Sequence, residues 1–169
     1  MKPSGLHAPL TLVIGPVTIT FTWAGDRWSH AVALADGRAW QSVEGARPVD
    51  GDQRWPASPV LVEVSPMETA HGPAILGVGL AGRSHFSASF SGDPDHAGRI
   101  RCEIACRLNE PPVWLGSTYR GHSGPVTVEP RLDVPTLPAT VRWGYSFGAE
   151  GLAPLAAPAG GEAPPPRQT

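Results

Sequence analysis

The stretch VTITFTWAGDRWSHAVALADGRAW, residues 17–40, decides the fold class of this chain. Apolar and polar residues alternate strictly in its first part, and they alternate again after each glycine-containing turn. Alternation with a period of two, in a segment rich in β-branched and aromatic residues, is typical of half-buried β-strands. The dipeptides Gly25-Asp26 and Asp36-Gly37 separate the alternating parts and favour tight hairpin turns. The stretch therefore predicts three antiparallel strands joined by two hairpins.

The turns also predict a register, because the number of turn residues decides which strand residues face each other. With two central residues in the first turn, the facing pairs are Trp23 and Trp28, Phe21 and His30, and Ile19 and Val32. With two central residues in the second turn, Trp40 falls out of phase with the inward-facing set and becomes a candidate for ligand contact.

Further alternating segments follow along the chain. The clearest are SHFSASF at residues 84–90, RIRCEIACRL at 99–108 and ATVRWGYSF at 139–147. No amphipathic helical pattern accompanies them, so we predict a single all-β domain over residues 8–150. A sandwich of two antiparallel sheets is the first choice. A β-barrel of lipocalin-like shape is the alternative, because an initial meander fits both.

Composition and charge indicate what to expect of the C-terminal tail and of nucleic acid as a partner. Residues 151–169 are rich in proline, alanine and glycine, so a disordered C-terminal tail is expected. The formal net charge is −2, and Lys2 is the only lysine. Without a basic surplus, nucleic acid is not an expected partner.

The chain carries no apolar run of membrane-spanning length and no segment typical of a signal peptide. We therefore expect no membrane association and take the cytoplasm as the default location. Cys102 and Cys106 are four residues apart on one predicted strand, about 13 Å at ~3.3 Å per residue. That separation is too long for a disulfide, so both are expected to be reduced and buried.

The pattern G-x-G-x-x-G occurs at residues 77–82, as GVGLAG. A dinucleotide site needs a helix directly after these glycines, but strand-like alternation follows Gly82. No cofactor is therefore expected. The glycines instead favour a bulge, a sharp bend or a place where another segment of the chain crosses closely. Gly77 and Gly79 share a strand face that lacks side chains, and we expect a bulky side chain from the facing sheet, or a ligand, to fill it.

Catalytic and metal motifs are equally incomplete. RGHSGP, residues 120–125, departs from G-x-S-x-G at Pro125 and lacks the strand and helix that a nucleophile elbow needs. The six histidines show no metal-ligand spacing, so no metal site is assigned, although distant segments could still assemble one.

Two groups of residues are candidates for ligand binding, together with Trp40. His30 lies in an otherwise apolar strand phase, and Trp23 and Trp28 could line a pocket around it. His85 shares a polar phase with serines, and Arg83 precedes it.

If the strand of His85 pairs with residues 99–108, the same face also carries Arg101, Glu103 and Arg107. Such a strip suits an acidic or hydroxylated partner, although a solvated sheet face has the same pattern.

Three classes of function fit these observations. The leading one is a non-catalytic binding module for a small polar ligand, a glycan or a protein partner. The second is a hydrolase-like enzyme with a site assembled from separated loops. The third is a structural protein that forms homo-oligomers through strand edges. The titratable candidates for the enzyme are His30, His85, His122, Asp26 and Glu103.

Overall fold

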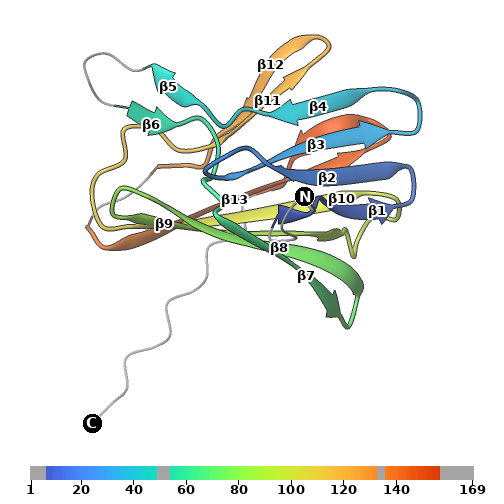
Figure 1. Cartoon of the computed structure of the whole chain (residues 1–169), viewed down its shortest axis with the longest axis horizontal. Coiled ribbons are helices and arrows are strands. Elements are labelled where there is room, and N and C mark those ends of the chain that lie inside the picture. The colour runs from blue at the N-terminus through green and yellow to red at the C-terminus, as the bar shows by residue number, and fades with distance from the viewer. Residues whose placement is uncertain (1–6, 49–53, 133–135, 157–169) are drawn as a thin grey trace, which may run out of the picture.

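The chain forms a β-sandwich, in which two six-stranded sheets pack face to face (Figure 1). The computed structural model describes residues 7–48, 54–132 and 136–156, and this part of the chain contains no α-helix. Each sheet has two free edges rather than closing on itself, so the predicted sandwich is confirmed and the barrel alternative is not.

The first sheet has the spatial order β1-β2-β3-β4-β11-β12. Its strands are β1 (Leu10–Ile14), β2 (Val17–Trp23), β3 (Trp28–Leu34), β4 (Ala39–Ser42), β11 (Ser117–Gly121) and β12 (Gly124–Val128). The first four form a meander of neighbouring hairpins; the alternating stretch predicts β2, β3 and β4 of it, and β1 adds a strand that was not predicted.

The second sheet has the order β14-β13-β10-β9-β8-β7. Its strands are β7 (Glu63–Thr69), β8 (Gly72–Ala81), β9 (Ser84–Gly92), β10 (Ile100–Leu108), β13 (Ala139–Gly148) and β14 (Gly151–Pro154). A separate two-stranded ribbon pairs β5 (Ala46–Pro48) with β6 (Arg54–Pro56), on the connection between the sheets.

The predicted register of the first hairpin is confirmed. The pairs are Trp23 with Trp28, Phe21 with His30, and Ile19 with Val32. The next hairpin differs, because its loop has three residues: Leu34 N–H donates to the Arg38 carbonyl at 2.8 Å. Trp40 therefore faces Val32 on the inner side of the sheet, and the prediction that it lies out of phase is wrong.

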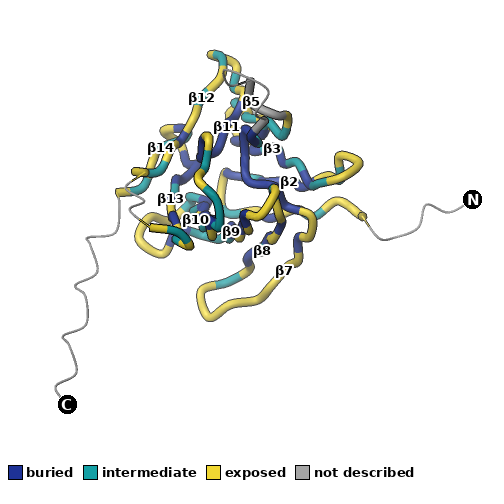
Figure 2. The backbone as a smooth tube through the Cα atoms, turned by 90° about the vertical axis from the view of Figure 1, so that its left-hand side faces the viewer, coloured by how far each residue is buried: buried dark blue, intermediate teal, exposed yellow. Residues whose placement is uncertain are grey.

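Aromatic side chains from both sheets meet in the core. Phe21 of β2 and Phe90 of β9 pack edge to face, with ring centroids 4.9 Å apart, and both are almost fully buried. Burying a side chain of this size contributes about 1.5–3 kcal/mol each. The backbone trace is buried where the sheets face each other and exposed at the turns, including the far end of the β7–β8 hairpin (Figure 2).

The glycines of GVGLAG lie within β8 and its turn. No helix follows: Gly82 has a left-handed φ of 58° and starts the two-residue turn into β9. Gly77 lies against the Leu61 side chain, and Gly79 lies against the Val60 backbone. The bulky side chain expected from the facing sheet is thus a wrong prediction, whereas the close crossing of another segment is confirmed, because the connection before β7 fills this space.

The domain continues beyond its predicted end at residue 150. Residues Gly151–Pro154 form β14 and pair with β13, with Phe147 facing Leu152. Gly151 adopts a φ of 100°, which allows the tight turn that returns the chain to the sheet. The expected disordered tail is therefore wrong for these residues. Leu155 still donates its N–H to the Gly144 carbonyl at 2.9 Å, and residues 157–169 lie outside the described residues.

Candidate functional site

Trp23, Trp28 and His30 lie side by side on the inner face of the first sheet. Trp28 and His30 are buried, whereas Trp23 is half-buried and stacks on His7 with ring centroids 4.0 Å apart. The cavity beside His30 encloses only about 10 Å³, and neither tryptophan lines it. The three side chains therefore do not share this cavity, and their role in ligand binding stays a prediction.

His30 belongs to a buried polar network that crosses the core. Its Nε2 lies 2.7 Å from the Tyr119 hydroxyl, which lies 2.7 Å from the Tyr145 hydroxyl. Ser117 accepts a hydrogen bond from the Trp143 indole N–H at 2.9 Å. These bonds link β3 and β11 of the first sheet to β13 of the second. Burial lowers the pKa of His30 to about 3, so the imidazole is neutral and holds the sheets together rather than titrating near neutral pH.

Trp40 is half-buried at the sandwich rim. Its ring lies 5.5 Å from that of Phe147, and a Cβ on Gly151 would lie 3.4 Å from it. The indole therefore covers the end of the core where β14 turns back. Its proposed ligand contact stays a prediction.

The polar strip expected around His85 is present on the outer face of the second sheet. Strand β9 pairs with β10, so His85 faces Arg107 and Ser89 faces Glu103. Along both strands the alternate residues are buried in the core. This pairing confirms that the strand of His85 lies beside residues 99–108, which the prediction of the polar strip required.

A groove of about 530 Å³ runs along this outer face. We call it the outer groove; its main lining residues are Val78, Leu80, His85, Ser87, Arg107 and Arg142. Strand β13 contributes Arg142, which pairs with Ala105. Ala105 lies two residues before Arg107 on β10, so the two arginines are diagonal neighbours on the same face. A second depression of about 750 Å³ continues from it and shares Val78, Ser87 and Arg142.

The arginines of this face differ in their partners. Arg101 pairs with Glu103 at 3.2 Å and with Asp95 at 3.6 Å. Within the described part of the chain, neither Arg107 nor Arg142 has a carboxylate within ion-pair distance. The alternation of residues 139–147 places Arg142 on the polar side of its strand, but only the strand order places it beside Arg107.

Arg83 is the second residue of the β8–β9 turn, whereas His85 lies on strand β9. Its backbone N–H donates to Glu110 Oε1 at 3.2 Å, and its carbonyl accepts from Asn109 Nδ2 at 2.8 Å. The side chain is exposed and does not line the outer groove. The structure therefore places only His85 of this pair in the groove.

The remaining titratable candidates are dispersed. His122 and Ser123 form the exposed turn between β11 and β12, 3.3 Å apart, which is a hairpin and not a nucleophile elbow. Among the described residues, no group of three or more His, Cys, Asp or Glu side chains is placed to hold a metal ion.

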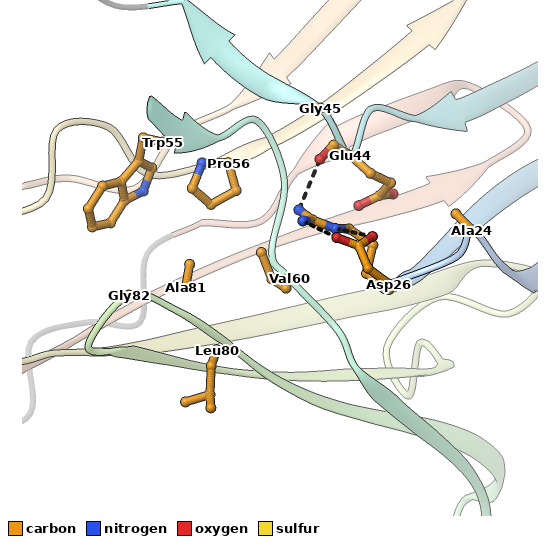
Figure 3. Close-up of a pocket in the computed structure, with 11 residues that line it drawn as sticks. Ala24, Asp26, Glu44, Gly45, Trp55, Pro56, Val60, Leu80, Ala81 and Gly82 are labelled. Atoms are coloured by element: carbon orange, nitrogen blue, oxygen red, sulfur yellow. Dashed lines mark hydrogen bonds and ion pairs between the residues drawn. The ribbon is translucent and has the colours of Figure 1, made fainter. Parts of the chain in front are cut away.

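Of these candidates, Asp26 alone lines a further hollow, which is a cleft at the end of the sandwich and is separate from the two hollows described above (Figure 3). Glu44 lies in the same cleft, and sequence analysis did not find it. Glu44 follows a four-residue strand with a single glycine after it, so no pattern in the sequence marks it.

No helix in the described ranges is long and apolar enough to cross a membrane. The chain matches no protein-family model, and comparisons with curated proteins and with solved structures give no significant match.

Proposed function

We propose that this protein is a non-catalytic binding module whose outer groove holds a small amphipathic anion. Such a ligand carries a carboxylate, phosphate or sulfate group together with a short apolar portion. The observation that carries the proposal is the pair Arg107 and Arg142, which lie as neighbours on the groove floor without a carboxylate partner in the described residues.

The arrangement of charge supports an anionic headgroup. His85 on β9 faces Arg107 on β10 directly. Arg142 on the adjacent strand β13 is the diagonal neighbour of Arg107. The two guanidinium groups repel each other, and a bound anion would offset that repulsion. Guanidinium groups also bind carboxylate and phosphate through paired hydrogen bonds.

The rim supports an apolar portion in the ligand. Val62, Val78 and Leu80 line the groove and are 44%, 49% and 51% exposed. Aliphatic side chains gathered beside an unpaired charged cluster are typical of a binding site, in which a few polar groups orient a mostly apolar contact.

Neither nucleic acid nor a membrane is proposed as the partner. Two arginines and one histidine would neutralise few phosphates, and the whole chain has a net charge of −2. The proposed location is the cytoplasm, with support from the two cysteines, which remain free thiols.

Calorimetric titration with four probes tests the proposal. Octanoate and octyl phosphate carry both features, inorganic phosphate lacks the tail, and octyl glucoside lacks the charge. We expect the two amphipathic anions to bind most tightly and their affinity to fall as salt is added.

Variants locate the site. Arg142→Gln should weaken octyl phosphate binding about tenfold, because a hydrogen bond to a charged group contributes about 1.5–3 kcal/mol. Arg120→Gln is the matched control, since Arg120 is an exposed arginine on β11 of the other sheet. Absence of binding by all four probes, equal binding of octyl glucoside, or equal loss in both variants would each overturn the proposal.

A further inference from the structure

The cleft in Figure 3 lies between the β2–β3 turn, the segment after β4, and the β8–β9 turn. It has a volume of about 580 Å³, which is the size of a small-molecule site. Leu80 separates it from the outer groove and lines both hollows. Its chemistry differs from that of the groove, because its polar wall is acidic.

Asp26 is held in place on this wall by its neighbour. Arg27 donates to both carboxylate oxygens of Asp26, from Nε at 3.0 Å and from Nη2 at 2.8 Å. Arg27 Nη1 also donates to the Glu44 carbonyl at 3.2 Å, which ties the turn to the segment after β4. The Asp26 side chain is still 70% exposed, so its remaining lone pairs are open to a ligand.

Glu44 provides a second oxygen pair beside Asp26. Ser42 donates its hydroxyl hydrogen to Glu44 Oε1, and the His30 backbone N–H donates to the same Ser42 oxygen at 2.8 Å. Burial raises the pKa of Glu44 to about 7. Near neutral pH this carboxyl group therefore both donates and accepts hydrogen bonds.

Trp55 supplies an independent indication that something binds here. The residue is only 8% exposed, and within the described part of the chain its indole nitrogen has no hydrogen-bond partner. Figure 3 shows that nitrogen on the side of the ring that faces Pro56 and the cleft. A buried N–H without a partner is unfavourable, and a ligand oxygen would satisfy it.

We propose that this cleft binds a small, uncharged, polyhydroxylated molecule of monosaccharide size. Separate hydroxyl groups of one ligand would accept from the Trp55 N–H and donate to the Asp26 carboxylate, so one ligand contacts both walls. Val60 and Leu80 lie between these walls and offer contact to the C–H face of a sugar ring. The exposed Asp26 carboxylate disfavours an anion, and the Arg27 guanidinium next to it disfavours a cation.

The indole N–H resonance of Trp55 gives a direct test by two-dimensional ¹H–¹⁵N NMR. Trp55→Phe assigns the signal, and glucose, galactose and mannose are then titrated into the full chain. We expect a saturable shift of the Trp55 signal with at least one neutral sugar. The signal of Trp114, whose indole donates to Glu129 at 3.1 Å away from the cleft, should stay in place.

A matched pair of variants checks the acidic wall. Asp26→Asn should weaken sugar binding about tenfold, because it removes a charged acceptor. Asp36→Asn is the control, because Asp36 pairs with Arg38 in the β3–β4 turn in the same way, without lining the cleft. Arg142→Gln should leave sugar binding unchanged, which separates this inference from the proposed anion site.

Three outcomes would overturn the inference. The first is that no neutral sugar produces a saturable shift of the Trp55 signal. The second is that Asp26→Asn and Asp36→Asn bind the sugar equally well. The third is that charged analogues bind more tightly than the neutral sugars, with glucosamine and glucuronate as the two probes of charge.

Discussion

The carbonyl group of Val60 lies directly against the α-carbon of Gly79, so that a Cβ at Gly79 would sit 1.9 Å from the Val60 oxygen. The contact is between two backbone segments, and neither can rotate away as a side chain could. Val62 N–H donates to the Val78 carbonyl at 2.8 Å, which fixes the crossing segment at this distance.

Gly79→Ala should therefore destabilise the fold strongly, by about 3 kcal/mol or more, because backbone must move to admit the methyl group. Gly45→Ala is the matched control: a Cβ there meets nothing within 4 Å, and the change should stay within about 0.5 kcal/mol. Denaturant unfolding measures both. Equal stability of the two variants would contradict the close approach.

Glu44 should make stability depend on pH. Burial raises the pKa of Glu44 from 4.5 to about 7, so between these values the folded chain holds a proton that the unfolded chain has lost. Stability from this group is complete below pH 4.5 and is lost as the pH rises through about 7. The loss is on the order of 3 kcal/mol at about 1.4 kcal/mol per pKa unit.

Denaturant unfolding of wild type and Glu44→Gln across this range isolates the effect. The difference in unfolding free energy between the two proteins should shift in favour of the variant as the pH rises. A difference that stays constant with pH would show that Glu44 ionises as freely in the folded chain as in the unfolded one.

His30 should make the stability of the fold depend on pH in the opposite direction, with a loss at acid pH. Burial lowers the pKa of His30 from 6.5 to about 3, so the unfolded chain takes up a proton first. Stability from this group is present above pH 6.5 and is lost as the pH falls toward 3. Relative to His30→Gln, the wild-type protein should lose stability on acidification, and a constant difference would contradict a buried neutral imidazole.

The Tyr119 hydroxyl should be the most sensitive point of the buried network. Tyr119→Phe removes the group that contacts both His30 and Tyr145, and leaves both without that partner. We expect a loss of about 2–4 kcal/mol, since each buried unsatisfied group costs about 1–3 kcal/mol. Ser123→Ala, which removes an exposed contact of 3.3 Å, should change thermal stability little.

Both cysteine thiols should be unreactive in the folded chain. Cys102 and Cys106 are free and fully buried, and burial raises the pKa of Cys106 to about 12 and that of Cys102 further. The thiolate is the reactive species, so iodoacetamide should modify neither residue under native conditions and both in denaturant. Mass spectrometry counts the adducts, and labelling of the native chain would contradict this burial.

Local patterns predicted the strands because a sheet face repeats every two residues. The alternation of residues 17–23 and 100–108 depends only on which side chains face the core. It can therefore be recognised in the sequence before the neighbouring strands are known. The Gly25-Asp26 turn predicted the register of the β2–β3 hairpin, because the number of turn residues decides which strand residues face each other. The length of the loop before Trp40 could not be read from the residues of the loop. It has three residues rather than two, and the extra residue places the Trp40 side chain on the inner face.

The candidate sites were less accessible to prediction, because their residues are distant in the chain. His85 and Arg107 were expected on one strip, but Arg142 joins them only through the order β9-β10-β13. The cleft brings Asp26, Glu44 and Trp55 together from three segments, and no spacing in the sequence links them.

The sequence by itself determined that this protein is an all-β chain, with two buried cysteines and a hairpin of known register. These are consequences of periodicity and turn chemistry, which act over a few residues. Only the tertiary structure decided what fills the space beside Gly79 and which charges remain unpaired on the outer groove. Those outcomes depend on how distant segments cross and on which strands become neighbours, and that choice is made by packing the whole core.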